Sequence, residues 1–252
     1  MEQLIYTLLA YINNSLDKDI NYSIATSLLT HNDKIEGFSL EAAAEVCNVA
    51  PSTINRFCKR IGFKNFSHLR NSAAIQAGAS SNKDYEKFLH TESFELKLKE
   101  NVKMIDNIKV DQMHRIVEKI HNSRKIVILG FEKNQVQAME LQKQLFLLGK
   151  LCECSTNLFK QVDALSVLTE EDMIITISIQ GNILTKEFSI IDKIKSAKGK
   201  KLLITFSDNI QQVEVFDEVL QCGKIEHSAI SSYTLLRLFD VLVRRYQKQY
   251  IS

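Results

Sequence analysis

The segment from residue 39 to 62, SLEAAAEVCNVAPSTINRFCKRIG, constrains the fold more than any other part of the chain. Ala44 is followed after three residues by Asn48, and Ile54 comes after five more. This spacing fits two short helices that cross, with a small residue at the crossing, a turn residue at positive φ, and an apolar anchor in the second helix. Glycine suits such a turn best, and asparagine is the next best tolerated. The segment therefore predicts a helix-turn-helix.

The expected outward face of the second helix carries the chemistry of base recognition. Its side chains are short and polar or hold a guanidinium group, and they are Ser52, Thr53, Asn55 and Arg56. Side chains of this kind read base edges in the major groove. We therefore expect this face to contact double-stranded DNA.

The local charge supports the same function. The formal net charge of the whole chain is only +2, which is far from the basic balance of a protein that binds nucleic acid over its whole surface. Between Val46 and Lys83, however, the sequence contains no Asp or Glu. The cations of this segment are Arg56, Lys59, Arg60, Lys64, Arg70 and Lys83. Such a patch can neutralise phosphates, although the charges alone would also fit a solvated helix face. Together with the turn spacing they favour DNA binding, and we include Lys59, Arg60 and Lys64 among the expected contacts.

Composition limits the other possibilities. A chain of 252 residues with 45% apolar residues is long enough for two domains, each with its own core. It has no run of about 18 apolar residues, and its N-terminus lacks the features of a signal peptide, so we expect a cytoplasmic protein without a membrane partner. Five scattered cysteines fit a reducing compartment. We read Cys152 and Cys154 as two side chains on one face of a strand, and we expect no metal site.

The hydrophobic period changes once along the chain. Up to about residue 76 the apolar stripes are helical, for example at Leu4, Leu8 and Ile12. The small and polar stretch 78–84, GASSNKD, reads as a linker. We therefore predict an all-α helix-turn-helix bundle over residues 1–77 and a second domain over 85–252.

Short β-rich runs alternate with helical stretches in the second domain. The expected strands are 125–130, 151–155, 172–179, 201–207 and, less clearly marked, 219–222. The expected helices are 85–108, 111–121, 135–148, 184–197 and 231–249. This alternation predicts an α/β fold with a doubly wound parallel sheet and helices on both of its faces. Ligands of such sheets bind at the carboxyl ends of the strands, so we place the pocket mouth at Gly130, 178–182 and 207–209.

The two halves together resemble a known family. The sequence from Arg56 to Phe66, RFCKRIGFKNF, followed by a linker and a βαβ domain, resembles the RpiR-type transcriptional regulators of bacteria, which carry a C-terminal sugar isomerase (SIS) domain. The resemblance covers essentially the whole chain. It implies a regulator of carbohydrate use that senses a phosphosugar effector and forms a homodimer or homotetramer through the SIS domain.

The expected ligand-binding loops depart from the family pattern. SIS domains hold a phosphate with a small-residue loop after the first strand and a Ser-x-Ser-Gly-x-Thr turn after the third. Here Glu132 and larger neighbours stand in the first loop, and Gln180 and Ile183 replace hydroxyl residues in the second. Either the ligand differs or the pocket is vestigial. The residues that we expect to line it are Gly130, Lys133, Asn134, Ser178, Gln180, Gly181, Asn182, Ser207, Asp208 and Asn209.

Three functions remain at this stage: a ligand-sensing regulator, a DNA-binding protein whose SIS domain only dimerises, and, as a distant third, a sugar-phosphate isomerase. An isomerase needs an acid/base residue beside the phosphate clamp, and Glu226 with His227 is the adjacent pair of suitable type. We favour capping and solvent-facing roles for this pair, and hence no enzyme. No cofactor is expected, because Gly130 lacks the companions of a dinucleotide fingerprint.

A single helix-turn-helix buries little DNA, so we expect two copies on a palindromic operator. Apolar residues of the last expected helix fit either a dimer interface or the core of one chain, and they are Leu235, Leu236, Phe239, Leu242 and Val243.

Overall fold

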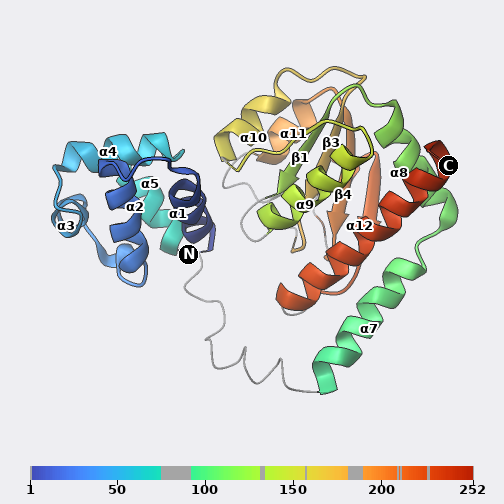
Figure 1. Cartoon of the computed structure of the whole chain (residues 1–252), viewed down its shortest axis with the longest axis horizontal. Helices are drawn as coiled ribbons and strands as arrows, with labels where there is room; N and C mark the ends of the chain where they lie inside the picture. The colour runs from blue at the N-terminus through green and yellow to red at the C-terminus, as the bar shows by residue number, and fades with distance from the viewer. Residues whose placement is uncertain are drawn as a thin grey trace. The chain divides into compact units, whose positions relative to one another are not determined.

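The computed structural model describes residues 2–74, 92–130, 134–156, 158–180, 190–208, 210, 212–225 and 228–251. These residues form two compact units. The first holds 2–74 and the second holds almost all of 92–251, drawn from blue to cyan and from green to red in Figure 1. The expected linker, 78–84, lies outside the described residues.

The first unit is a bundle of short helices, as the sequence predicted. Its elements are α1 (Glu2–Asn14), α2 (Ile20–Thr30), the 3-10 turn η1 (Ile35–Gly37), α3 (Leu40–Val46), α4 (Pro51–Arg60) and α5 (Phe66–Ala74). Leu4 and Leu8 of α1 pack in one core with Ile24 and Leu28 of α2. Burial of these side chains supplies most of the stability of such short helices, which are marginal in isolation.

Side chains fix where two of these helices begin. Asp19 accepts a hydrogen bond from the Tyr22 backbone N–H at 2.9 Å, and Ser39 accepts one from the Ala42 N–H at 3.1 Å. Each bond satisfies an N–H group that has no partner within its helix. The first cap fixes the start of α2. The second fixes the start of α3, the first helix of the predicted helix-turn-helix.

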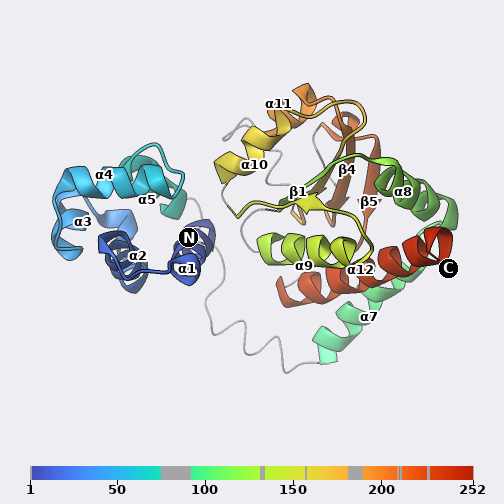
Figure 2. The ribbon, with the colours of Figure 1, turned by 45° about the horizontal axis from the view of Figure 1, so that its top comes forward.

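The second unit is a parallel sheet between helices. Its elements in chain order are α7 (Glu92–Asp106), α8 (Val110–Asn122), β1 (Ile126–Gly130), α9 (Asn134–Leu147), β2 (Cys152–Glu153), α10 (Leu158–Leu165), β3 (Met173–Ile177), α11 (Ile190–Ser196), β4 (Lys200–Thr205), η4 (Val213–Val215), β5 (Glu218–Gln221) and α12 (Ser228–Tyr250). The strand order is β2-β1-β3-β4-β5, and every neighbouring pair is parallel. Figure 2 shows α10 and α11 on one face of the sheet and α9 and α12 on the other. The predicted doubly wound α/β fold is confirmed.

The central strands are buried on both faces. All five residues of β1 and all five of β3 are buried, which explains their continuous apolar runs. Gly130 at the end of β1 is in register with Ile177 at the end of β3, and Ile177 is in register with Ile204 of β4. The carboxyl ends of these three strands therefore meet at one edge of the sheet.

Two sequence expectations about the helices need correction. The short helix α10 was not predicted. In the last helix, Leu235, Phe239 and Leu242 are fully buried in the core of their own chain, so they are not available to a dimer interface. Leu236, another of the apolar residues considered for the dimer interface, remains accessible at 43% exposure. The correction follows from packing, because α12 contacts α7, α8 and α9, and the three buried residues belong to the core of the second unit.

Candidate functional site

The turn between α3 and α4 has the backbone geometry that its sequence predicted. Asn48 has a φ of 52°, in the left-handed region. Its N–H donates to the Glu45 carbonyl at 2.9 Å, and the Val49 N–H donates to the Ala44 carbonyl at 2.9 Å. These two bonds form a Schellman motif, which ends α3 and satisfies its last carbonyls. Ala44 is buried beneath this turn, as expected for the small residue at the crossing of the two helices.

The second helix has equally well-defined ends. Pro51 occupies the first turn of α4, where its fixed φ favours helix initiation. At the other end Gly62 has a φ of 100°. Its N–H donates to the Lys59 carbonyl at 3.2 Å, and the Phe63 N–H donates to the Cys58 carbonyl at 2.8 Å. A second Schellman motif therefore ends α4.

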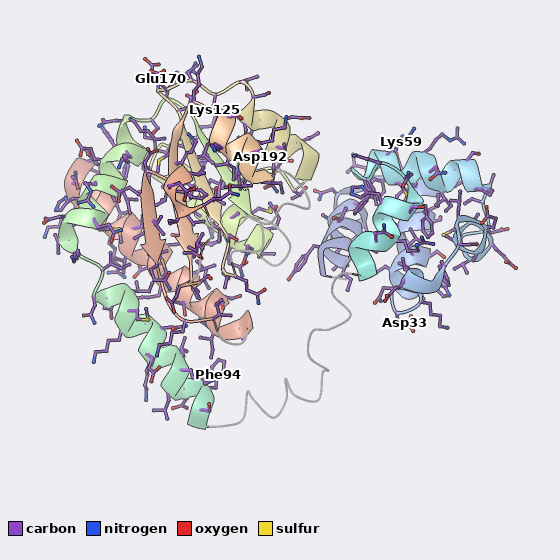
Figure 3. All side chains as sticks on the ribbon, turned by 180° about the vertical axis from the view of Figure 1, so that it is seen from behind. Asp33, Lys59, Phe94, Lys125, Glu170 and Asp192 are labelled. Atoms are coloured by element: carbon purple, nitrogen blue, oxygen red, sulfur yellow. The ribbon has the colours of Figure 1, made fainter. Side chains whose placement is uncertain are left out.

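The two faces of α4 differ in chemistry. Ile54, Phe57 and Cys58 are fully buried, and the ring of Phe57 packs edge-on against Tyr11 at 5.5 Å between centroids. On the other side Ser52, Arg56, Lys59 and Arg60 are exposed and Thr53 is half-buried. Figure 3 shows Lys59 on this helix. The helix thus presents hydroxyl and cationic groups to solvent from a rigid, anchored backbone.

Arg56 is held in place by its own helix. Its guanidinium Nη2 donates to Thr53 Oγ1 at 3.1 Å, one turn earlier. The remaining N–H groups of the guanidinium keep their fork geometry, which matches the O6 and N7 acceptors of guanine. Thr53 therefore acts as a positioning residue for Arg56.

Asn55 does not point outward as expected. Its amide oxygen accepts the backbone N–H of Phe66 at 3.0 Å, and the residue is half-buried. The N–H groups at the start of α5 need acceptors, and Asn55 supplies one while Asn65 caps the His68 N–H at 2.9 Å. Asn55 thus links the recognition helix to the following helix.

The basic residues after α4 differ in their surroundings. Lys64 is exposed, whereas Arg70 is half-buried and donates to the Phe38 carbonyl at 3.2 Å. The Lys64 backbone N–H donates to His68 Nδ1 at 3.2 Å. Burial lowers the pKa of His68, and the charge of Lys64 lowers it further, so the imidazole is neutral near pH 7. Among the described residues, the exposed cations of the expected patch are therefore on α4 and in the loop that follows it.

In the second unit, the ends of β1 and β3 form the topological switch point of the sheet. With the order 2-1-3-4-5, the connections from β1 and β3 run in opposite directions, and ligands of such sheets bind in the crevice outside these strand ends. A Cβ atom on Gly130 would lie 2.5 Å from the Ala138 Cβ and 2.7 Å from the Asn134 carbonyl oxygen. Glycine is therefore required, because the first turn of α9 packs directly against the end of β1.

Several expected pocket residues do gather at this edge. Ser178 and Ser207 are buried, at 3% and 8% exposure, and follow β3 and β4. The Ser178 N–H donates to the Ile204 carbonyl at 2.9 Å, and the Ser207 N–H donates to Thr205 Oγ1 at 3.2 Å. Asp208 accepts from the Gln221 amide at 2.9 Å, which directs its carboxylate toward β5.

Asn134 and Gln180 complete the described part of the crevice. Gln180 is exposed. Asn134 begins α9, and its buried Oδ1 has no hydrogen-bond partner among the described residues. A buried acceptor of this kind favours a ligand that brings a donor, such as a hydroxyl group. The other expected ligand residues, Lys133, Gly181, Asn182 and Asn209, lie outside the described residues, as do Glu132, Ile183, Glu226 and His227.

A buried glutamine supports the end of β1 and was missed from the sequence. The Gln161 amide nitrogen lies 3.0 Å from the Gly130 carbonyl, 2.8 Å from Gln135 Oε1 and 2.7 Å from the Ser155 carbonyl. Gln161 is only 2% exposed. Its position on the apolar side of a helix over 158–165 could have indicated a buried polar role. That inference first requires the stretch to be recognised as a helix.

The described residues show no arrangement for metal binding. No group of three or more His, Cys, Asp or Glu residues converges within them. Burial raises the pKa of Cys152 to about 12 and that of Cys154 to about 11, so both thiols are protonated and unreactive at neutral pH. Among the described helices, none has the length and apolar content to cross a membrane.

Comparison with known proteins agrees with both units. Residues 6–80 match the family profile of the helix-turn-helix domain, rpiR family. These residues therefore resemble the helix-turn-helix domains of the rpiR family. It is 27% identical over 171 residues to an uncharacterized HTH-type transcriptional regulator of Haemophilus influenzae, covering 63% of this chain and 59% of that relative. It is 24% identical over 216 residues to a second such regulator, from Clostridium perfringens, covering 81% of this chain and 70% of the relative.

Solved structures with the same fold include sugar isomerase-type proteins. The Vibrio vulnificus NanR protein complexed with ManNAc-6P has a TM-score of 0.54 at 20% identity, over 98% of this chain and 92% of NanR. A putative sugar-phosphate isomerase from Listeria monocytogenes has a TM-score of 0.51 at 18% identity, over 68% and 92%. A phosphoheptose isomerase from Francisella tularensis has a TM-score of 0.50 at 14% identity, over 68% and 100%. The second unit therefore has the SIS-like fold.

Proposed function

We propose that this chain is a sequence-specific DNA-binding transcriptional regulator of carbohydrate metabolism. The outward face of α4 is the observation that carries the proposal. It combines exposed Ser52, Arg56, Lys59 and Arg60 with a turn held by Asn48 at positive φ. Two relatives described as HTH-type transcriptional regulators support the assignment.

The residues of this face have different roles. Arg56, held by Thr53, reads a base edge, and Ser52 contacts a neighbouring base or phosphate. Lys59, Arg60 and Lys64 neutralise phosphates, which supply most of the sequence-independent affinity. For Asn55 we retain a DNA contact through its amide nitrogen, because its oxygen is bonded to α5.

The protein acts as a homo-oligomer on a palindromic operator. One small helix-turn-helix covers too little DNA for tight specific binding. Two copies related by a two-fold axis place their recognition helices in successive major grooves, about 34 to 36 Å apart or a multiple of that distance. The second unit, rather than the small first unit, supplies the pairing surface.

The crevice at the ends of β1, β3 and β4 binds the effector, a phosphorylated sugar or a related sugar. Ser178 and Ser207 offer hydroxyl and backbone groups there, and the unpartnered Asn134 Oδ1 suits a sugar hydroxyl. The proposed lining also includes Gly130, Lys133, Gln180, Gly181, Asn182, Asp208 and Asn209. The NanR structure, described as complexed with ManNAc-6P, supports this ligand class.

The phosphate of such a ligand is held differently from the usual family arrangement. Gln180 and Ile183 stand where hydroxyl residues are expected, and Glu132 adds a like charge. A charge-assisted hydrogen bond contributes about 1.5 to 3 kcal/mol, so the loss of two weakens binding by a factor of about a hundred or more. We therefore expect dissociation constants for simple sugar phosphates well above the micromolar range.

Isomerase activity is the second candidate, because the Francisella tularensis neighbour is described as a phosphoheptose isomerase. That reaction needs an acid/base residue within hydrogen-bond reach of the sugar. Glu226 and His227 are the sequence candidates. Because the phosphate clamp is altered and both relatives are described as regulators, we propose that the chain is not an enzyme.

A ligand screen on the full chain tests the effector proposal. Thermal melting is measured with sugar phosphates and free sugars, and each ligand that raises the melting temperature is titrated by calorimetry into the wild type and Ser178→Ala. We expect weak binding that Ser178→Ala abolishes. Micromolar binding of a hexose or hexosamine phosphate that needs Ser178 would contradict the altered phosphate site. The absence of any shift would instead support a domain that only dimerises, and isomerisation of a titrated ligand would support the enzyme.

A further inference from the structure

Helix α9 carries apolar side chains on two opposite sides. Its inner side buries Ala138, Leu141 and Leu145 completely in the core of the second unit. Its outer side exposes large apolar residues, namely Val136 at 56%, Met139 at 46%, Phe146 at 61% and Leu147 at 74%. A helix that is apolar all round is usually covered on both sides, and clustered apolar exposure marks an interaction surface.

Helix α8 of the same unit shows what a solvent-facing helix looks like here. It also buries one apolar face, with Met113, Ile116 and Ile120. Its exposed positions, however, are mainly charged, as at Asp111, Arg115 and Glu118. The apolar outer side of α9 is therefore a property of this helix and not of the unit as a whole.

The outer side of α9 is symmetric about its midpoint. Val136, Glu140, Lys143 and Leu147 follow the spacing i, i+4, i+7 and i+11, which places them in one stripe along the helix. The two charges stand in the middle, with Lys143 Nζ 2.6 Å from Glu140 Oε2, and the two apolar residues stand at the ends. Met139 and Phe146 border the stripe. Reversing the direction of the helix exchanges Val136 with Leu147 and Glu140 with Lys143.

We propose that a second copy of this chain covers this stripe, with α9 of each protomer antiparallel to α9 of its partner. A two-fold axis then passes between Glu140 and Lys143. Each Glu140 meets the partner's Lys143, and each Val136 packs beside the partner's Leu147. A two-fold interface requires a surface that is complementary to itself, and the reversed order of charges and apolar groups provides it. The proposal names the pairing surface of the homo-oligomer proposed above.

The neighbouring helix extends this surface. α9 packs against α12, and Gln137 donates to Ser232 Oγ at 3.0 Å between them. Tyr233 and Leu236 of α12 are 56% and 43% exposed. A stable interface buries roughly 800 Å² on each partner, more than one helix of 14 residues covers alone. Leu236, one turn after Ser232 on α12, adds apolar area beside the stripe, whereas Tyr233 packs against Phe94 of α7.

Charge reversal tests the pairing directly. Sedimentation equilibrium of the full chain gives the dimer dissociation constant for the wild type, Glu140→Lys, Lys143→Glu and the double variant with both reversals. Each single change places like charges across the axis, so we expect the constant to rise about tenfold or more. The double variant restores opposite charges across the axis and should return to within about threefold of the wild type.

Two further variants separate the surface from the fold. Leu147→Glu should give monomers, whereas Val110→Glu, at an exposed apolar position of α8, should remain dimeric. Both variants should still fold, because neither residue is in the core. If Leu147→Glu and the single reversals stay dimeric, the proposed α9 surface is wrong, but the proposal that the chain forms a homo-oligomer is not contradicted. If the wild type is a monomer at micromolar concentration, both proposals are wrong.

Discussion

The outward face of α4 and the crevice at the ends of β1, β3 and β4 are both candidate binding sites. They differ in how far apart in the sequence their residues lie. The α4 face lies within one helix of ten residues, which begins at Pro51 and ends in a Schellman motif at Gly62. The crevice joins strand ends about 75 residues apart, from Gly130 to Thr205. Local rules of turn and helix formation therefore specify the first site, whereas the second depends on loops between strands.

The two sites also differ in what holds their side chains. On α4, Arg56 is positioned by Thr53 within the same turn. At the crevice, Gly130 is positioned by residues of two other helices, through the close approach of Ala138 and the hydrogen bond from Gln161. The geometry of the α4 face should therefore depend on residues of its own helix, and that of the crevice on the packing of α9 and α10.

The largest effect is expected from the anchor of the recognition helix. Ile54→Ala removes a fully buried side chain from the core that holds α4. Truncation of a buried isoleucine costs about 2 to 5 kcal/mol of unfolding free energy. Urea denaturation should show this loss in the first unit, together with loss of DNA binding at 37 °C.

The matched control for that change is Ser52→Ala on the exposed side of the same helix. We expect its unfolding free energy to stay within about 0.5 kcal/mol of the wild type. Equal destabilisation by both changes would show that α4 is oriented differently from this structure.

Gly130→Ala tests the close packing of the crevice and should have an intermediate effect. The added Cβ would meet the Ala138 side chain and the Asn134 carbonyl at less than 3.0 Å. Because one contact is to backbone, α9 must shift, at a cost of about 1 to 3 kcal/mol. The melting temperature of the second unit should fall, while DNA affinity per dimer should not change. A neutral Gly130→Ala would mean that β1 and α9 are less tightly packed than described.

Asn55→Ala should have a smaller effect and a diagnostic one. The change removes the acceptor of the Phe66 N–H, and loss of such a cap costs about 1 kcal/mol. If Asn55 acts mainly as this link, Asn55→Asp should retain stability, because a carboxylate also accepts the bond. Calorimetric melting measures both variants. Full stability of Asn55→Ala would favour a role in base reading instead.

The sequence predicted the fold where the determining residues are neighbours in the chain. Asn48 marked the positive-φ position of the turn between α3 and α4, and the buried runs of β1 and β3 marked the sheet. It failed where distant packing decides. α10 was missed, and the outward orientation of Asn55 was wrong because α5 needed its oxygen.

The same reason explains the last helix and the ligand site. Leu235, Phe239 and Leu242 have the pattern of an exposed interface as well as that of a core, and only the packing of α7, α8 and α9 around α12 decides between them. Gly130, Ser178 and Ser207 meet at one edge of the sheet, as expected for residues that end or follow neighbouring parallel strands. That this edge binds a ligand, and through which of its residues, stays a prediction.

The central claim is that α4 reads DNA, and one comparison of two variants tests it most directly. A DNA sequence is first selected from a random pool by the full-length protein. Its affinity, and that of an unrelated duplex, is then measured over a range of salt concentrations for the wild type, Arg56→Ala and Lys59→Ala. Arg56→Ala should lose about 1 to 3 kcal/mol on the selected sequence and much less on the unrelated one. Lys59→Ala should weaken binding to both duplexes alike and lower the salt slope by about 1. Full affinity of both variants for the selected sequence would contradict the assignment of α4 as the recognition helix.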